Sequence, residues 1–306
     1  MKKYNLLAVI GATASGKTAF AARLASTLKG EIISADSRQV YRGMDIGTGK
    51  DLKDYFVDGK EVKANLVDIV DAGYQYNVFE YQQDFLKVFE DLSRRNCFPV
   101  LCGGSGMYIE AILKNYKLIR VPDNQVLRET LLGKELTELT KILESYKSSL
   151  HNVSDIHNIK RAIRAIEIAD YCYKNPEIDT KMPPISSLNI GLKYDRLSRR
   201  RRITQRLEQR LNEGMLEEVK QLLDFGITPE ALIYYGLEYK FLTQHLIGKI
   251  SYDEMFEKLN IAIRQFAKRQ MTWFRKMEKQ GTEIHWLDGY LPMEDKVKRT
   301  LELLNR

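Results

Sequence analysis

Gly11-Ala12-Thr13-Ala14-Ser15-Gly16-Lys17-Thr18 fits the pattern G-x-x-x-x-G-K-[ST] at every fixed position and follows an apolar run at residues 6–10. This order predicts a strand, a tight glycine turn and a helix over residues 17–28, with backbone N–H groups and the positive end of the helix dipole facing one point. Residues 11–18 are therefore predicted to bind a diphosphate or triphosphate, with Lys17 on the terminal phosphate and the Thr18 hydroxyl on Mg²⁺. The alternative is a strand-to-helix turn without a ligand.

The chain of 306 residues exceeds the usual single-domain size, so we expect one large α/β domain with a smaller insertion or appendage. Hydrophobic residues make up 44% of it, but no apolar run has the length of a membrane span and no signal-peptide pattern is present. The three cysteines and four histidines form no disulfide or zinc pattern. We expect a cytoplasmic protein whose net charge of +7 permits a polyanionic partner without requiring one.

Asp36 follows a second predicted strand, residues 31–35, and a glycine-rich loop comes next at residues 44–50. In open α/β sheets ligands collect at the carboxyl ends of the strands, so the Asp36 side chain is expected in the same crevice as residues 11–18. Three roles are compatible with an aspartate there: an outer-shell Mg²⁺ ligand, a general base, or a helix N-cap.

A second glycine-rich turn, Gly103-Gly104-Ser105-Gly106, follows a strand predicted over residues 98–102. Its glycines let a ligand approach the backbone closely and leave the Ser105 hydroxyl free to bond that ligand. A plain tight turn into a helix over residues 107–113 explains the same pattern, so both interpretations stay open at this point.

The pattern becomes helical and charged from about residue 117 to residue 184. Leucines between residues 127 and 143 form an amphipathic series interrupted at Gly133, and a helix over residues 156–168 carries Arg161 and Arg164 on one face. The segment is too long for a simple crossover between two strands. We therefore interpret it as a mainly helical insertion, after which the chain returns to a strand at residues 188–192.

An arginine-rich helix is predicted after that strand. One of its faces carries arginines at i, i+3, i+7 and i+11, namely Arg199, Arg202, Arg206 and Arg210, and acidic residues are scarce before Glu208. A solvated charged face ordinarily alternates in sign, so we interpret this face as binding an anion.

The last third is predicted to be helical at residues 216–223, 229–235, 239–247 and 252–279, followed by a short strand at 284–287 and a small terminal helix. The longest helix has a mainly apolar face, which includes Gln270 and is expected to pack onto the sheet. Arg264, Lys268 and Arg275 share another face. That basic face is suited to a nucleic-acid backbone, although an isolated basic face is often only solvated.

Six segments taken together closely resemble the tRNA dimethylallyltransferase family and follow the family's order along nearly the whole chain. They are residues 11–18, Asp36-Ser-Arg-Gln-Val-Tyr41, Ile46-Gly-Thr-Gly-Lys50, Gly103-Gly-Ser-Gly-Met-Tyr108, Lys160-Arg-Ala-Ile-Arg-Ala-Ile-Glu167 and Ala267-Lys-Arg-Gln-Met-Thr-Trp-Phe-Arg275. The resemblance implies an α/β fold with a parallel-sheet core like that of P-loop NTPases and nucleoside kinases. The core would comprise residues 1–117 and 185–306, the latter with a lid-like arginine helix and C-terminal helices, and residues 118–184 would be a tRNA-contacting insertion.

The same resemblance implies a reaction, in which a dimethylallyl group passes from dimethylallyl diphosphate to N6 of the adenosine on the 3′ side of the tRNA anticodon. Diphosphate is then the leaving group, held by residues 11–18 and Mg²⁺ on one side and by Arg202 and Arg206 on the other. Asp36 becomes the general base, and Ser105 bonds the tRNA near the adenine, so Asp36, Ser105 and Arg202 are the catalytic candidates. A monomer is expected.

Contacts with the anticodon stem-loop are implied for residues from several segments. They are Asp36, Ser37, Arg38, Gln39, Ser105, Arg128, Lys160, Arg161, Ala162, Ile163 and Arg164, to which the basic helix face adds Arg264 and Lys268. The adenosine is expected to leave its stack to reach a buried site.

Several positions depart from the family's pattern, namely Ala64, Asn65, Asn158, Gly236, Leu237 and Ile263. Three alternative functions stay open: a P-loop small-molecule kinase, a tRNA-binding relative that has lost catalysis, and an enzyme that prenylates free adenine nucleotides. A small acceptor does not need the basic helical third, whereas binding through several tRNA phosphates is expected to weaken steeply with salt.

Overall fold

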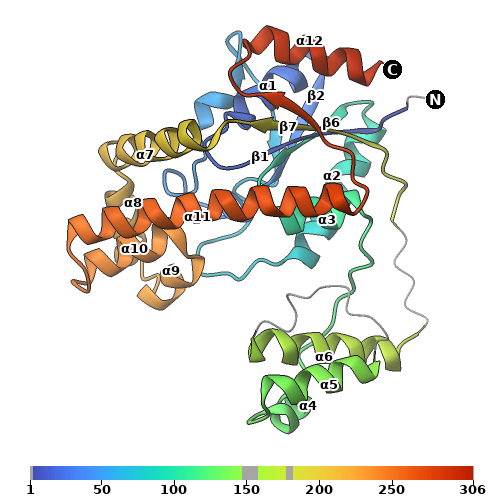
Figure 1. Ribbon diagram of the computed structural model, residues 1–306, viewed down its shortest axis with the longest axis vertical. Helices are drawn as coiled ribbons and strands as arrows, with labels where there is room; N and C mark the ends of the chain where they lie inside the picture. The colour runs from blue at the N-terminus through green and yellow to red at the C-terminus, as the bar shows by residue number, and fades with distance from the viewer. Residues whose placement is uncertain (1–2, 147–157, 177–181, 306) are drawn as a thin grey trace. The chain divides into compact units, whose positions relative to one another are not determined.

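Six parallel strands form the central sheet, in the order β5-β2-β6-β1-β7-β8 (Figure 1). Their bounds are β1 Leu6–Gly11, β2 Gly30–Ala35, β5 Ala64–Asn65, β6 Phe98–Gly103, β7 Ser187–Lys193 and β8 His285–Asp288. A separate antiparallel pair consists of β3 Phe56–Val57 and β4 Lys60–Glu61. Parallel strands need crossover connections, so helices cover both faces of such a sheet. The predicted α/β parallel-sheet core is thereby confirmed in this computed structural model.

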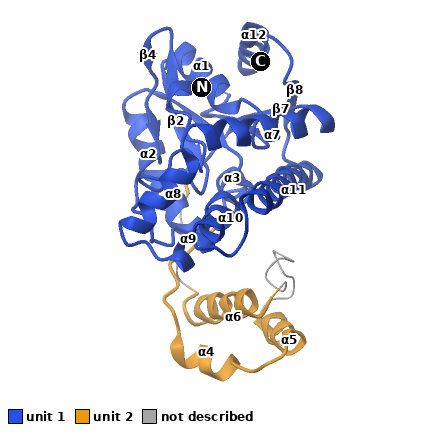
Figure 2. Cartoon of the chain, turned by 90° about the vertical axis from the view of Figure 1, so that its left-hand side faces the viewer, with its two compact units in different colours: residues 1–116, 183–306 blue, residues 117–182 orange. Residues whose placement is uncertain are grey.

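The larger of two compact units contains this sheet and comprises residues 1–116 and 183–306, while residues 117–182 form the smaller unit (Figure 2). The structure describes residues 3–146, 158–176 and 182–305. No helix in these described ranges combines the length and the apolar character needed to cross a membrane.

Alternate residues of β1 face opposite sides of the sheet, and both sides are buried. Leu6, Ala8 and Ile10 belong to one hydrophobic cluster, and Leu7 and Val9 belong to another. The second cluster is covered by α1 Lys17–Leu28 and α12 Met293–Leu304. The first is covered by α2 Val78–Arg94, α3 Gly106–Leu113, α7 Arg196–Asn212, α8 Met215–Asp224, α9 Pro229–Tyr235, α10 Leu237–Leu246 and α11 Tyr252–Lys279. A short 3₁₀ helix, η1, spans Leu52–Tyr55.

The longest helix, α11, has the bounds that the sequence predicted. It begins with a capping box, in which Ser251 and Glu254 each accept a hydrogen bond from the other's backbone N–H. Ile263 and Met277 of the predicted apolar face are buried in the first cluster. The helix reaches the sheet core while lying against α3, α7 and α10 (Figure 1).

The edge strand β5 was not predicted, because two residues give no periodic signal. It contains both Ala64 and Asn65, which depart from the family's pattern. Asn65 Nδ2 donates to Glu31 Oε2 at 3.0 Å and to the Ile32 carbonyl at 3.1 Å, so its amide holds β5 against β2. The departure at Asn65 therefore has a local structural role.

The smaller unit contains α4 Gln125–Leu131, α5 Leu136–Tyr146 and α6 Ile159–Lys174 within its described residues (Figure 2). Gly133, with φ of +80°, separates α4 from α5 at the predicted interruption. Asn158, another departure, caps α6 by accepting the Arg161 N–H at 2.9 Å. Leucines of α4 and α5 pack against alanines and an isoleucine of α6 and make a core of their own. The first two residues of the helix predicted over 156–168 lie outside the described residues.

Candidate functional site

The phosphate loop lies between the end of β1 at Gly11 and the start of α1 at Lys17. Ala14 and Gly16 have φ values of +60° and +74°, so the chain turns through left-handed conformations that direct backbone N–H groups to one side. A Cβ atom at Gly11 would lie 2.8 Å from Ser15 Oγ, so this position has no room for a side chain. The predicted strand, turn and helix are therefore all present.

A cavity of 390 Å³ lies against this loop, with helix α7 and residues 51–54 forming its other walls. Five basic side chains line it, Lys17, Lys53, Arg202, Arg206 and Arg210, together with three acidic ones, Asp51, Asp54 and Glu213. The excess of positive charge at a helix N-terminus favours an anionic ligand.

Two groups in the loop lack partners that a phosphate would supply. Ser15 Oγ is buried and has no hydrogen-bond partner among the described residues. Burial lowers the pKa of Lys17, and the charges of Arg206 and Arg210 act in the same direction, while Asp36 acts against them. A bound phosphate would accept from the hydroxyl and supply counter-charge to the ammonium.

Helix α7 brings three of the four predicted arginines, Arg202, Arg206 and Arg210, to the cavity. The Arg202 Nε donates to the Ala14 carbonyl at 2.9 Å, and its guanidinium lies 4.6 Å from the centre of the Tyr194 ring. Arg206 forms an ion pair with Asp51. Arg199, the fourth arginine of the predicted anion-binding face, does not line the cavity. Burial lowers the pKa of its guanidinium, and the charge of Arg275 acts in the same direction.

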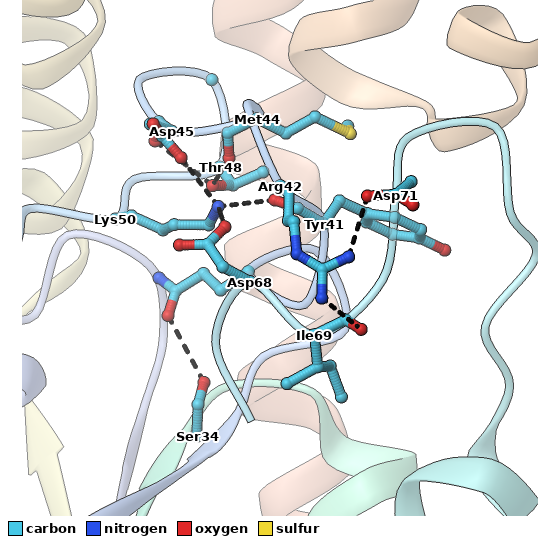
Figure 3. Close-up of polar contacts among 12 residues, drawn as sticks. Ser34, Tyr41, Arg42, Met44, Asp45, Thr48, Lys50, Asp68, Ile69 and Asp71 are labelled. Atoms are coloured by element: carbon cyan, nitrogen blue, oxygen red, sulfur yellow. Dashed lines mark hydrogen bonds and ion pairs between the residues drawn. The ribbon is translucent and has the colours of Figure 1, made fainter. Parts of the chain in front are cut away.

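Lys50 fixes the loop that leads to Asp51. Its side chain is fully buried, and its Nζ donates to the Tyr41 carbonyl at 2.5 Å and to Asp45 Oδ1 at 2.7 Å, and also pairs with Asp68 (Figure 3). On the same loop, the Glu218 carboxylate accepts backbone N–H groups of three successive residues, Asp45, Ile46 and Gly47. The motif at residues 46–50 thus works as an anchor for the wall of the cavity.

Asp36 is half-buried at the carboxyl end of β2, and its Oδ1 accepts the Arg38 N–H at 3.0 Å. No helix starts there, so the N-cap alternative for Asp36 is wrong. Ser105 Oγ accepts the Ser37 N–H at 2.9 Å and donates to Ser37 Oγ at 3.2 Å. The serine therefore joins the ends of β6 and β2 and holds the turn that carries Asp36.

Gln270 was predicted only as part of an apolar face. It is buried, and its amide bridges the two glycine turns, because Oε1 accepts the Thr13 N–H at 2.8 Å and Nε2 donates to the Gly104 carbonyl at 2.9 Å. The sequence signal that could have revealed this role was a single amide side chain within an otherwise apolar helix face. Asp51, which follows the motif at residues 46–50 directly, was also missed.

The candidates for tRNA contact in the larger unit differ in accessibility. Gln39 is buried and donates to the Gly49 carbonyl at 3.1 Å, so its amide is engaged internally. The Arg38 guanidinium lies 5.3 Å from the centre of the Tyr235 ring. Arg264 donates to Thr204 Oγ1 at 2.8 Å, whereas Lys268 is exposed.

In the smaller unit, Arg128 and Arg164 both pair with the buried carboxylate of Glu167, at 2.8 and 3.0 Å. Although burial acts in the opposite direction, these two arginines lower the pKa of Glu167. The Ala162 side chain is fully buried in the core, so it offers no side-chain surface for the predicted contact of this residue with tRNA. Exposed or partly exposed positions are Lys160, Arg161 and Ile163.

The donor set around Thr18 suits a hard cation. Thr18 and Asp54 line the cavity with oxygen atoms, and the described residues contain no group of three histidine, cysteine or acidic side chains that would form a complete protein cage. Mg²⁺ commonly binds through one or two protein oxygens, substrate phosphates and water. These residues therefore fit Mg²⁺ bound together with a phosphorylated ligand.

Comparisons with known proteins identify the family. The model of the IPP transferase family matches residues 39–277, and that of the isopentenyl transferases matches residues 4–67. The chain is 59% identical to tRNA dimethylallyltransferase 2 of Bacteroides fragilis over 297 residues, which is 97% of each chain. It is also 59% identical to tRNA dimethylallyltransferase 1 of Parabacteroides distasonis over 306 residues, 100% of this chain and 99% of that one.

Solved structures give the same result. The tRNA isopentenylpyrophosphate transferase of Bacillus halodurans is similar with a TM-score of 0.69 and 29% identity, over 98% of this chain and 94% of that one. A eukaryotic dimethylallyltransferase acting on tRNA shares the fold, with a TM-score of 0.75 at 22% identity over 94% of this chain and 74% of that one. The chain therefore belongs to the tRNA dimethylallyltransferase family of enzymes, the IPP transferases.

Proposed function

We propose that this enzyme transfers a dimethylallyl group from dimethylallyl diphosphate to N6 of the adenosine on the 3′ side of the anticodon in tRNA, releasing diphosphate. The observation that carries the proposal is the basic cavity at residues 14–19, whose lysine lies close enough to Asp36 for that carboxylate to affect its pKa. The proposed diphosphate site follows β1 and the proposed base follows β2, and both strands pair in parallel with β6, so the two lie at the same end of the sheet.

The donor side supplies charge to the leaving group. As the bond between the allylic carbon and oxygen breaks, its electron pair passes to the diphosphate, and negative charge develops there. Lys17, Arg202 and Arg206 can stabilise that charge through charge-assisted hydrogen bonds. Mg²⁺ at the Thr18 hydroxyl would supply further positive charge to the diphosphate oxygens.

The acceptor side removes one proton. The exocyclic amine attacks the allylic carbon, and the new C–N bond leaves a positive charge on nitrogen until a proton departs. The Asp36 carboxylate is the proposed acceptor of that proton. Ser105, through its two hydrogen bonds to Ser37, holds the turn that sets the position of Asp36.

The exposed basic side of α11 supports a nucleic-acid substrate. Lys268, Arg269 and Arg275 are exposed and form no ion pair with an acidic residue in the described part of the chain. Unpaired cations on one helix can neutralise successive phosphates, which makes binding salt-dependent. We propose that these residues contact the tRNA backbone.

Labelled substrates separate this function from a small-molecule kinase. The protein is incubated with dimethylallyl diphosphate or with ATP, each with and without tRNA, and released diphosphate and labelled products are measured. The proposal predicts tRNA-dependent release of diphosphate from the prenyl donor. Phosphoryl transfer from ATP to a small acceptor, without prenylation of tRNA or of AMP, would contradict it; prenylation of AMP alone would support a nucleotide prenyltransferase instead.

A further inference from the structure

Asp51 lies between two arginines of α7. One carboxylate oxygen, Oδ2, is paired with Arg206, and the other, Oδ1, lies 4.0 Å from the Nη2 of Arg210. All three side chains line the phosphate cavity. A single carboxylate is thus bonded to one guanidinium and stands just beyond hydrogen-bond distance of a second.

Arg210 is buried without a strong partner. It is 7% exposed, its Nε has no hydrogen-bond partner, and its contact with Asp51 is its one ion pair within 4.0 Å among the described residues. Glu238 lines a small adjoining cavity with it, but no ion pair within 4.0 Å joins these two side chains. Burial raises the pKa of the Glu238 carboxyl. An arginine stays protonated at neutral pH, so this guanidinium lacks a full counter-charge.

The loop is shaped to admit Arg210. A Cβ atom at Gly49 would lie 1.8 Å from the Nη2 of Arg210, so the glycine of the motif at residues 46–50 leaves the space that this guanidinium occupies. The next residue, Lys50, is anchored by its three oxygen partners (Figure 3). Asp51 follows Lys50 directly in the sequence. The proximity of Asp51 to Arg210 is therefore set by the anchored backbone.

Diphosphate bound at Arg206 must compete with Asp51 for the same guanidinium. Leaving the carboxylate without a partner beside a bound anion would be costly, because like charges repel and the group has lost part of its water. A shift of about 1 Å would bring Asp51 Oδ1 from 4.0 Å to the distance of a charge-assisted hydrogen bond with Arg210.

We propose that Asp51 and Arg210 form an exchange pair: Asp51 holds Arg206 while the cavity is empty and moves to Arg210 when the donor diphosphate takes Arg206. The inference rests on the proposed function, because diphosphate is its ligand. Arg210 is then a positioning residue that acts through Asp51, and the family's glycine-rich motif before it sets the geometry of the exchange.

A double-mutant cycle tests the exchange, with inorganic diphosphate and Mg²⁺ as the probe and calorimetry as the measurement. Asp51→Asn removes the competing carboxylate and is expected to tighten binding about threefold. Arg210→Met leaves Asp51 without its second partner and is expected to weaken binding about tenfold. The double variant is expected to bind diphosphate less than about threefold more weakly than Asp51→Asn alone, because Asp51 is no longer charged. Arg201→Met, an exposed arginine of α7 outside the cavity lining, controls for net charge.

If Arg210→Met weakens diphosphate binding equally in the wild-type and Asp51→Asn backgrounds, the exchange is overturned. Arg210 would then act on diphosphate directly or through its long-range charge. Weaker diphosphate binding by the single variant Asp51→Asn would also overturn the exchange. That result holds whether or not Arg210→Met folds. Circular dichroism checks the folding of Arg210→Met. A wild-type protein that binds no diphosphate would contradict the proposed function itself. Wild-type binding with additive effects would contradict only the exchange.

Discussion

The Gln270 side chain of α11 accepts a hydrogen bond from the Thr13 backbone N–H at 2.8 Å. This bond ties the middle of the longest helix to the phosphate loop, although 257 residues separate the two in sequence. The same amide donates to the Gly104 carbonyl, so one buried side chain sets the distance between the two glycine turns. The shape of the phosphate site thus depends on the packing of a helix whose opposite side is basic.

Replacing Gln270 by leucine should weaken both stability and diphosphate binding, because the Thr13 N–H and the Gly104 carbonyl would lose their partner. The expected loss in free energy of unfolding is about 2 kcal/mol, measured by urea denaturation. The dissociation constant of diphosphate should rise by about tenfold. Gln265→Leu changes an exposed glutamine of the same helix and should stay within about 0.5 kcal/mol. Equal behaviour of the two variants would show that the bridge is unimportant.

Asp36→Asn should separate chemistry from donor binding. The amide keeps the shape of the side chain but cannot take the proton, so we expect the turnover rate to fall by about 10²- to 10⁴-fold. Diphosphate affinity should be unchanged or tighter, since a negative charge near Lys17 is removed. Asp253→Asn, at an exposed position of α11, is the matched control and should be fully active. Retention of more than about a tenth of the activity by Asp36→Asn would rule out the general base.

Diphosphate binding should weaken at a lower alkaline pH than it would if Lys17 had the ordinary pKa of a lysine. Burial lowers the pKa of Lys17 from its usual 10.5, and binding needs the protonated form. The contribution of the Lys17 charge to diphosphate affinity is therefore fully present below the lowered pKa and is lost as the pH rises through it. Lys17→Arg stays charged over that range, so this part of the pH dependence should disappear. Parallel affinity curves for wild type and Lys17→Arg between about pH 7 and pH 10 would contradict the prediction.

Lys50→Met should destabilise the larger unit. The substitution leaves Asp45 and Asp68 without their cation, but both carboxylates are partly exposed, at 48% and 41%, and can regain water. We therefore expect a loss of about 2 kcal/mol in the free energy of unfolding, below the cost of breaking a fully buried pair. Lys60→Met, at an exposed position that forms no ion pair among the described residues, should have no measurable effect. Similar unfolding curves for both variants would show that Lys50 is not an anchor.

The sequence located features whose signal is local. The phosphate loop could be found because a strand, its glycines and a helix start lie within a few residues, and the start of α1 follows from that motif. The bounds of α11 follow from periodicity and from its capping box. The ends of β2 and β6 could be placed in one crevice because parallel strands present their carboxyl ends together.

Features that depend on distant segments could not be found in this way. Gln270 bridges two turns more than 150 residues away, and Asp51 acquires its role only when α7 packs beside it. Arg128 looked available for tRNA, but in the fold it meets Glu167 from another helix. Ala162 shares a motif with exposed cations yet faces the core, which a single motif cannot reveal. Charge and motif identity predict chemistry, while packing decides which side chains are free to perform it.

The most direct measurement is nucleoside analysis of tRNA after incubation with the wild-type protein, dimethylallyl diphosphate and Mg²⁺. Unmodified tRNA is digested to nucleosides, and the products are identified by mass spectrometry. The account predicts a new adenosine derivative that carries a dimethylallyl group on N6, mapped to the position on the 3′ side of the anticodon and absent with Asp36→Asn. Unchanged adenosine after incubation with a folded wild-type protein that binds tRNA would contradict it.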